Sequence, residues 1–521
     1  MLHPIRSALT LGVALIATTA VAGEFPFATT VQPPRRVQVI VHRGAHDQTP
    51  ENTITALEYS IADAVEWVEV DVRLSRDGRH VLIHDADLGR TTDGQGPVAD
   101  RTLAELKSLD AGSKFAARFA GARIPTLEEA LATAKGRVNL ALDCKQVDPA
   151  RLVRDVLEAG MERQVVIFAG TDILRTVRSA PGGERLALMP KWKPADGLDA
   201  FGDLQPAAVE VDAADVTSEL CRTFHGRGIK VQVKTLGTDD RPEIWDRVTE
   251  AGADWLQTDR AEEFLARSVL RRIDPAARVK VAHHRGSSRY APENTLPAYE
   301  KAIRLGADLV EFDLRTTRDG QLFLLHDGRL DRTTNARGPI REHDAAEVAG
   351  LDAGAWFGRP FIGTAVPKFD DFLRTVAGRV ELYVDAKDLS PEALVSALRA
   401  HDLIDRAIVY QHPDYLARLR VIEPRLRRMP PLADPSQIAP LADRLEPYAF
   451  DTRWNLLSKS LIDQCHARGV KVFSDALGLN ETEASYRRAI LDGIDLIQTD
   501  HPVRVLRAIE LLDASGRPPQ D

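Results

Sequence analysis

The stretch of sequence that decides the fold is VIVHRGAHDQTPENTITALEYSIADAVEWVEVDV, residues 39–72, because it occurs twice. Shifted by 242 positions, it stands over VAHHRGSSRYAPENTLPAYEKAIRLGADLVEFDL, residues 281–314, with no insertion or deletion. The same register continues to Asp143-x-Lys145 and Asp385-x-Lys387, and it slips by one residue only near the ends. The chain is therefore a duplicated unit of about 240 residues, far longer than the 20–50-residue repeat of a solenoid.

Each copy alternates β-branched, strand-like runs with helical stretches, a pattern that indicates parallel βαβ units. One further run follows the second strand after only a tight turn, which is too short for a crossover, so we expect it to be an antiparallel hairpin arm. A large open α/β sheet would also fit the size of one copy. Eight strands favour the α/β class with two tandem (β/α)8 TIM-like barrels. The expected strands of the first copy are residues 37–41, 67–72, 138–143, 165–168, 185–189, 208–212, 230–233 and 254–258, with the arm at 80–85, and the second copy repeats the pattern, including 309–314, 321–327, 380–385 and 495–499.

The N-terminal residues 1–22 differ from the rest of the chain. Arg6 precedes an apolar run that ends in Ala20-Val21-Ala22, which is typical of a secretory signal peptide cleaved near Ala22. An uncleaved anchor is the alternative, although about 15 apolar residues are short for a membrane span. We expect a secreted or periplasmic mature chain without a transmembrane span. Its two barrels are expected at 35–272 and 278–513, joined by a short linker at Asp274-Pro275.

The composition excludes several classes of protein. With 44% hydrophobic and 28% charged residues, the chain is an ordinary globular one. A net charge of -9 without a long like-charge run argues against nucleic acid as a partner. Three cysteines without CxxC spacing form neither a disulfide framework nor a thiolate zinc site. We expect a small-molecule partner, and the sequence carries no signal for an oligomeric state.

Carboxylates occur where the barrel strands end, which is where such barrels build active sites. Glu69 and Asp71 are two residues apart in one strand and therefore face the same side. Confining like charges is costly unless a cation intervenes. Asp143 ends the next barrel strand, with Lys145 on the same face, so a structural Asp–Lys ion pair is the alternative. Oxygen ligands without cysteine favour Mg²⁺ or Ca²⁺. The second copy repeats these residues as Glu311, Asp313, Asp385 and Lys387.

Two histidines and an arginine complete the set in each copy. His42-Arg43-Gly44 ends the first strand, and taken alone it could be a solvated turn, while His84 closes the hairpin arm. Histidine is the side chain best matched to proton transfer near neutral pH. Arginine and lysine beside a divalent cation are typical of a phosphate site. The second copy preserves all three residues as His284, Arg285 and His326.

Together these motifs resemble the glycerophosphodiester phosphodiesterase family, whose pattern runs HRG, PENT, ExD, HD, an acidic residue-x-Lys, and a final TD. In the first copy the PENT motif is residues 50–53 and the final TD is residues 258–259, and the second copy has every motif again. The resemblance implies a TIM barrel, a divalent cation, and hydrolysis of glycerophosphodiesters to glycerol 3-phosphate and an alcohol.

The resemblance also implies residue roles, carried over position by position. The implied metal ligands are Glu69, Asp71 and Asp143, and Glu311, Asp313 and Asp385. The implied acid/base residues are His42 and His84, and His284 and His326. The implied phosphate-binding residues are Arg43, Lys145, Arg285 and Lys387. Glu51 and Glu293 either line the site or interact with backbone N–H groups at a helix start.

Two departures from the family pattern matter. The third metal ligand of the family is usually glutamate, whereas this chain has Asp143 and Asp385. Aspartate is one methylene shorter, so the metal affinity is expected to differ from that of the family. The family tends to have tryptophan in a V-x-V-W-T stretch, where this chain has Lys234, so the alcohol pocket is expected to differ. Two alternative functions remain: a phospholipase D-like activity on lysophospholipids or sphingolipids, and a non-catalytic phosphodiester-binding or structural module. No histidine is lost from either copy, which argues against the second.

Overall fold

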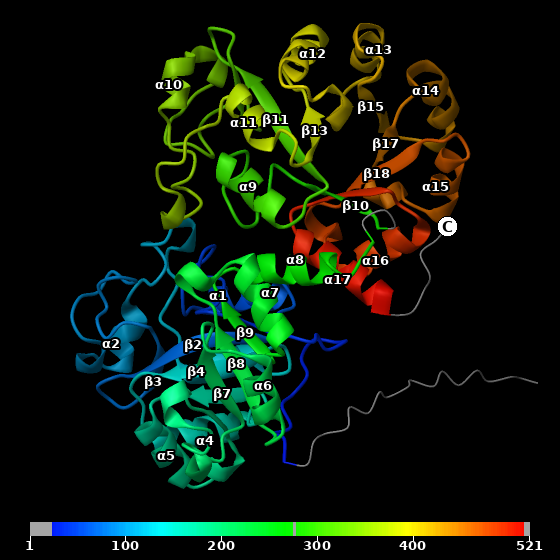
Figure 1. Ribbon diagram of the computed structural model, residues 1–521. Helices are drawn as coiled ribbons and strands as arrows, with labels where there is room; N and C mark the ends of the chain where they lie inside the picture. The colour runs from blue at the N-terminus through cyan, green and yellow to red at the C-terminus, as the bar shows by residue number, and fades with distance from the viewer. Residues whose placement is uncertain (1–22, 275–277, 515–521) are drawn as a thin grey trace, which may run out of the picture.

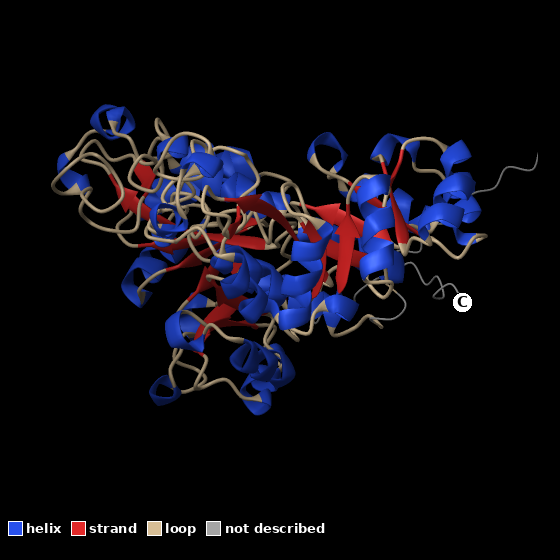
Figure 2. Ribbon diagram, turned by 90° about the horizontal axis from the view of Figure 1, so that it is seen from above, coloured by secondary structure: helices blue, strands red, loops and turns tan. Residues whose placement is uncertain are grey.

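The computed structural model describes residues 23–274 and 278–514, which form two β/α barrels in succession (Figure 1). In each barrel a ring of parallel strands is surrounded by helices (Figures 1 and 2). The two tandem barrels confirm the predicted fold class. The predicted signal peptide, residues 1–22, lies outside the described residues.

The first barrel has eight parallel strands in the order β6-β5-β4-β2-β1-β9-β8-β7. Its ends meet where Lys191, just after β6, pairs in parallel with Glu210 of β7. The strands are β1 Gln38–Val41, β2 Trp67–Leu74, β3 His80–Leu82, β4 Asn139–Cys144, β5 Val165–Phe168, β6 Ala187–Met189, β7 Ala208–Asp212, β8 Lys230–Lys234 and β9 Trp255–Thr258. The helices are α1 Ile54–Ala62, α2 Leu103–Ser108, α3 Leu127–Ala134, α4 Pro149–Ala159, α5 Thr171–Ser179, α6 Ser218–His225, α7 Pro242–Ala251 and α8 Ala261–Leu270.

The second barrel repeats this order as β15-β14-β13-β11-β10-β19-β18-β17-β16. Only Pro430 separates β15 from β16, so the two act as one interrupted strand that closes the ring. The strands are β10 Lys280–His283, β11 Leu309–Thr316, β12 Leu322–Leu324, β13 Glu381–Asp385, β14 Ala407–Tyr410, β15 Arg427–Met429, β16 Pro431–Leu432, β17 Ala449–Thr452, β18 Lys471–Asp475 and β19 Leu496–Thr499. The helices are α9 Leu296–Arg304, α10 Ala345–Ala349, α11 Phe369–Val376, α12 Pro391–Ala400, α13 Pro413–Ile422, α14 Ile438–Leu445, α15 Lys459–His466, α16 Glu483–Asp492 and α17 Pro502–Ala514.

The predicted hairpin arm is present in both barrels. β3 pairs antiparallel with β2, and β12 pairs antiparallel with β11. The arm is shorter than the predicted 80–85, because β3 ends at Leu82 and residues 84–85 form part of a bend at the barrel mouth.

Aromatic side chains fill the first barrel at the end opposite the expected site. Trp67 and Trp255, at the starts of β2 and β9, lie with ring centroids 4.6 Å apart. Phe27, from the segment before β1, packs edge-on against both rings at 5.3 and 5.1 Å. This apolar plug excludes water from the bottom of the barrel, so the polar mouth is the place left for chemistry.

The two barrels dock through α8 and the second barrel's α9 and α17 (Figure 1). Apolar residues of α8 and α17 belong to one continuous hydrophobic cluster that spans both barrels. Buried ion pairs flank the cluster: the Lys301 ammonium lies 2.5 Å from Glu262 and 2.8 Å from Glu263. The barrels are therefore joined by a packed interface as well as by the linker.

Candidate active sites

Three carboxylates converge at the mouth of each barrel, as the strand periodicity predicts. Glu69 and Asp71 are buried on β2, and Asp143 is half-buried at the end of β4. One carboxylate oxygen of each lies within 4.8 Å of the others. Glu311, Asp313 and Asp385 form the same group in the second barrel.

Basic side chains border each carboxylate group. The Lys145 ammonium lies 2.5 Å from Asp143 Oδ2 and 3.3 Å from Asp71 Oδ1. Arg43 Nε lies 3.5 Å from Asp71 Oδ2. In the second barrel Lys387 and Arg285 make the same contacts with Asp385 and Asp313. The Asp–Lys pair that the sequence left as an alternative is thus present, but it sits at the edge of the three-carboxylate group rather than replacing it.

The electrostatics of the carboxylates fit a cation. Burial, reinforced by the charges of Asp71 and Asp143, raises the pKa of Glu69 well above its ordinary value. Burial also raises the pKa of Asp143, against the opposing effect of Lys145. Glu311 has its pKa raised by burial and by Asp313. A divalent cation among these oxygens would relieve the repulsion, and an all-oxygen donor set suits Mg²⁺ or Ca²⁺.

A strained turn places the first histidine next to these carboxylates. Arg43 adopts a left-handed conformation, with φ of 54°, and its backbone N–H donates to Glu69 Oε2 at 2.8 Å. A Cβ on Gly44 would lie 2.7 Å from the Cβ of Ala56, so α1 packs too closely for any other residue. Such strain in a non-glycine residue is typical of functional sites. Arg285 repeats the turn in the second barrel, with φ of 52° and a 2.7 Å hydrogen bond to Glu311.

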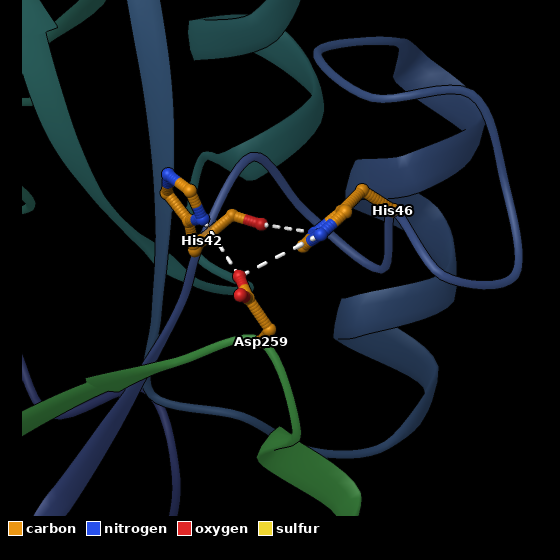
Figure 3. Close-up of side chains that lie close together, drawn as sticks. All are labelled: His42, His46 and Asp259. Carbon is orange, nitrogen blue, oxygen red and sulfur yellow. Dashed lines mark hydrogen bonds and ion pairs between the residues drawn. The ribbon is translucent and has the colours of Figure 1, made fainter. Parts of the chain in front are cut away.

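A carboxylate at the end of β9 fixes the orientation of the first histidine (Figure 3). His42 Nδ1 lies 2.7 Å from Asp259 Oδ1, and Figure 3 shows Nε2 on the opposite side of the ring. With the Nδ1 proton donated to Asp259, Nε2 is left free to exchange a proton. His46 lies beside the pair, with Nδ1 2.9 Å from the His42 carbonyl and Nε2 3.6 Å from Asp259.

The second barrel keeps the pair but changes its neighbour. His284 Nδ1 lies 2.8 Å from Asp500 Oδ1, and Ser288 replaces His46, donating its hydroxyl to the same carboxylate at 2.7 Å. Burial dominates at His42 and lowers its pKa. Burial also opposes the charged form of His284, but the hydrogen bond to Asp500 and the charge of Glu311 outweigh it and raise the pKa of His284 to about 9.

The second histidine belongs to a chain of charged groups that the sequence revealed only in part. His84 Nδ1 lies 2.7 Å from Asp85, whose carboxylate accepts from Arg90 at 2.6 Å. Arg90 also binds both oxygens of Glu51, at 2.6 and 2.7 Å. Glu51 therefore contacts the guanidinium groups of both Arg43 and Arg90. The second barrel repeats the chain with His326, Asp327, Arg332 and Glu293.

Sequence reasoning gave no role to Arg90 or Asn52, although a signal for both was available. Arg90-Thr91-Thr92 recurs as Arg332-Thr333-Thr334, and Asn52 stands inside the repeated PENT motif. The Asn52 amide donates to Asp71 Oδ2 at 2.8 Å, and its carbonyl accepts from the Asp71 backbone at 2.9 Å. It thereby holds one of the three carboxylates in place.

The walls of the two mouths differ in charge. Lys234 of β8 stands opposite Gln257, and Asp475 of β18 stands opposite Gln498, so strand register aligns the lysine of one barrel with the aspartate of the other. Burial and the charges of Asp475 and Asp385 raise the pKa of Asp451, on the neighbouring β17, to about 7. Glu210 of β7 occupies the position of Asp451 in the first barrel, so the exchange of Lys234 for Asp475 is what makes the second mouth the more acidic of the two.

A sequence profile of the Glycerophosphoryl diester phosphodiesterase family matches residues 42–263 and again residues 284–504. The chain belongs to this family. A glycerophosphodiester phosphodiesterase from Caldanaerobacter subterraneus is 30% identical over 239 residues, which cover 44% of this chain and 97% of that protein. A glycerophosphodiester phosphodiesterase from Bacillus subtilis is 36% identical over 142 residues, covering 25% of this chain and 48% of that protein.

The crystal structure of a glycerophosphodiester phosphodiesterase from Agrobacterium tumefaciens is 28% identical, with a TM-score of 0.42 over 44% of this chain and 100% of that one. The relative from Caldanaerobacter corresponds in length to one barrel of the present chain. Membership of the glycerophosphoryl diester phosphodiesterase family makes the protein a phosphoric diester hydrolase.

Proposed function

We propose that both barrels are active, metal-dependent glycerophosphodiester phosphodiesterases, and that each releases glycerol 3-phosphate and an alcohol. The observation that carries the proposal is the recurrence, in both barrels, of three converging carboxylates beside a carboxylate-held histidine pair. Mg²⁺ or Ca²⁺ held by Glu69, Asp71 and Asp143, and by Glu311, Asp313 and Asp385, would offset the phosphate charge.

The basic groups beside the carboxylates bind the diester phosphate in this proposal. Arg43 and Lys145 lie within 3.5 Å of Asp71 and so point to the same space as the carboxylates. Their donors suit the non-bridging phosphate oxygens, with the guanidinium able to bind two at once. Glu51 orients Arg43, whose Nη1 lies 3.4 Å from it. Arg285, Lys387 and Glu293 take these parts in the second barrel.

His42 and His84 transfer the protons in the first barrel. One histidine accepts the proton of the attacking group, and the other donates a proton to the alcohol oxygen as its bond to phosphorus breaks. Attack by water gives glycerol 3-phosphate directly, whereas attack by the substrate's own glycerol hydroxyl gives a cyclic phosphate that water then opens to glycerol 3-phosphate. Asp259 and Asp85, at 2.7 Å each, hold the two imidazoles by Nδ1 and leave Nε2 for the exchange. His284 and His326 do the same beside Asp500 and Asp327.

We also propose that the enzyme acts outside the cytoplasm, secreted or periplasmic after cleavage near Ala22. The support is the sequence of residues 1–22 alone. Among the described residues, none of the helices combines the length and the apolar character that crossing a membrane requires. The comparisons support neither a phospholipase D-like activity nor a non-catalytic module.

Phosphorus NMR of the purified protein with glycerophosphocholine, glycerophosphoethanolamine and lysophosphatidylcholine tests the proposal. We expect glycerol 3-phosphate from the first two, no turnover after exhaustive dialysis against a chelator, and recovery on adding Mg²⁺ or Ca²⁺. Full activity after the chelator treatment would refute metal dependence. Turnover of lysophosphatidylcholine alone would favour the phospholipase D-like alternative.

A further inference from the structure

A cavity at the mouth of the first barrel is lined by residues of both barrels. Its volume is about 400 Å³. The first barrel contributes residues of the site itself and of its rim, and the second barrel contributes Arg359 and Pro360. The first-barrel residues that matter for charge are His46, Asp47, Glu51, Arg90 and Lys114.

Specific contacts hold the second barrel's loop at this mouth. The Arg359 backbone N–H donates to the Phe115 carbonyl of the first barrel at 2.8 Å. A Cβ on Gly358 would lie 2.6 Å from the Phe115 ring, so a larger residue at this position would have to displace the ring. In return, the Arg118 guanidinium of the first barrel lies 4.2 Å from the centroid of the Phe357 ring. The position of Arg359 is therefore fixed at its backbone while its side chain is exposed.

The charges that line the cavity do not balance. Arg90 and Arg43 neutralise Glu51, and Asp47 lies 3.7 Å from His46. Lys114 donates to the Gly89 carbonyl and has no ion-pair partner among the described residues. The Arg359 side chain forms neither a hydrogen bond nor an ion pair with any described residue. Lys114 and Arg359 thus face the cavity, and neither has a described carboxylate within ion-pair distance.

We propose that Arg359 and Lys114 form an anion subsite between the barrels, which binds a second negatively charged group on the alcohol of the diester. The subsite rests on the proposed function, because Glu51 and Arg90 place it next to the site that would hold the scissile phosphate. It makes the first barrel selective for diesters whose alcohol carries a phosphate or carboxylate. An alcohol of this kind would extend from the site toward the second barrel.

Duplication alone does not reproduce this subsite. In the register of the repeat, Trp356 stands in place of Lys114, and Ala117 is the first-barrel residue that corresponds to Arg359. Neither replacement carries a charge. The subsite is therefore a property of the docked pair of barrels and serves the first barrel alone.

A matched pair of substrates, glycerophosphoinositol and glycerophosphoinositol 4-phosphate, isolates the second negative charge. In a His284→Ala background, which leaves only the first barrel active, Arg359→Ala should raise KM for the phosphorylated diester about 2–5-fold, an effect that weakens at high salt, as for an exposed charge pair. KM for glycerophosphoinositol should change less than about twofold by the same reasoning. Arg359→Lys should retain most of the preference, because it keeps the charge.

Two controls are matched to this variant. Arg341→Ala removes an exposed arginine from the same barrel outside the cavity and should leave both substrates unaffected. Arg359→Ala in a His42→Ala background, where only the second barrel works, should also change nothing. An equal rise in KM for both substrates, or no rise for either, would overturn the subsite. If no diester is turned over at all, the proposed function fails instead, and calorimetric titration with inositol 1,4-bisphosphate still decides whether Arg359→Ala weakens anion binding.

Discussion

At the scale of single residues, each proposed acid/base histidine is positioned by a carboxylate that is specific to it. Asp259 and Asp85 hold His42 and His84 at the same distance, 2.7 Å, although one carboxylate ends β9 and the other is the next residue in the chain. The long-range partner follows β9, so the geometry of His42 depends on the pairing of β1 with β9. Asp85, the neighbouring partner of His84, lies beyond the end of β3 and is held by its hydrogen bond from Arg90.

Removing one histidine from each barrel tests their roles. We expect His42→Ala to slow the first barrel and His284→Ala to slow the second by roughly 10²–10⁴-fold each, because general acid/base catalysis is lost. The double variant should retain almost no turnover of glycerophosphocholine. Its folding is checked by circular dichroism. A folded double variant that keeps more than about 5% of the wild-type kcat would contradict the assignment, since even the low end of that range leaves about 1%.

At the scale of elements, the sequence predicted the strands well because the buried β-branched runs of the barrel leave little ambiguity. β2 is buried along Trp67–Val72, and the carboxylates within it stood out for that reason. The HRG, ExD and Asp-x-Lys residues could be placed from strand ends alone. Contacts made by loops could not: the reach of Arg90 to Glu51, and of Arg359 to Phe115, depends on insertions whose path no periodicity specifies.

A contact between the end of a helix and the start of a strand predicts a pH-dependent stability. His225, the last residue of α6, lies 2.7 Å from Asp254, which also accepts from the Val231 backbone at 2.9 Å. The hydrogen bond to Asp254 raises the pKa of His225. A raised pKa in the folded state contributes stability below the unfolded value of about 6.5, and this stability is lost as the pH rises through the folded pKa.

We therefore expect His225→Ala to lower the free energy of unfolding by roughly 0.2–1 kcal/mol at pH 6, as is usual for a partly exposed pair. The difference from the wild type should shrink toward pH 9. Urea unfolding at both pH values measures it. A difference that stays constant, or that grows with pH, would show that the charged pair is not its source.

At the scale of the whole molecule, duplication has kept the chemistry and changed its surroundings. The first mouth has Lys234 and Lys114 where the second has Asp475 and Trp356. The Trp356 ring is half-buried, with the Arg118 guanidinium 5.9 Å from its centroid, so part of its face already has a cation beside it. We therefore expect the acidic wall of the second mouth to contribute more than Trp356 does to the binding of a cationic alcohol.

This difference predicts that the barrels prefer different alcohols. With only the second barrel active, in His42→Ala, the ratio of kcat/KM for glycerophosphocholine over glycerophosphoinositol should exceed the ratio in His284→Ala by several-fold. The quaternary ammonium is attracted by Asp475 in one mouth and repelled by Lys234 in the other. Exchanging the two charges, by Lys234→Asp and Asp475→Lys, should reverse the order. Identical ratios in the two single variants would refute specialisation.

The docked interface predicts that the two barrels unfold together. Arg289 of the second barrel lies 3.3 Å from Asp63 of the first and stacks 4.6 Å from the Tyr59 ring, with about 10% of its side chain exposed. Tyr290 also donates to Asp63, at 3.2 Å, but brings no charge. Arg289→Ala would leave the Asp63 carboxylate buried without a cation, which should lower the free energy of unfolding by about 3–5 kcal/mol, as for a buried pair.

Because the hydrophobic cluster spans both barrels, we expect one calorimetric transition in the wild type and two in Arg289→Ala. Arg329→Ala is the control: it removes an exposed ion pair within the second barrel and should keep the single transition. Adding Asp63→Asn to Arg289→Ala should restore part of the lost stability, because the side chain at position 63 is then neutral. A single, unshifted transition in Arg289→Ala would show that this ion pair does not couple the barrels.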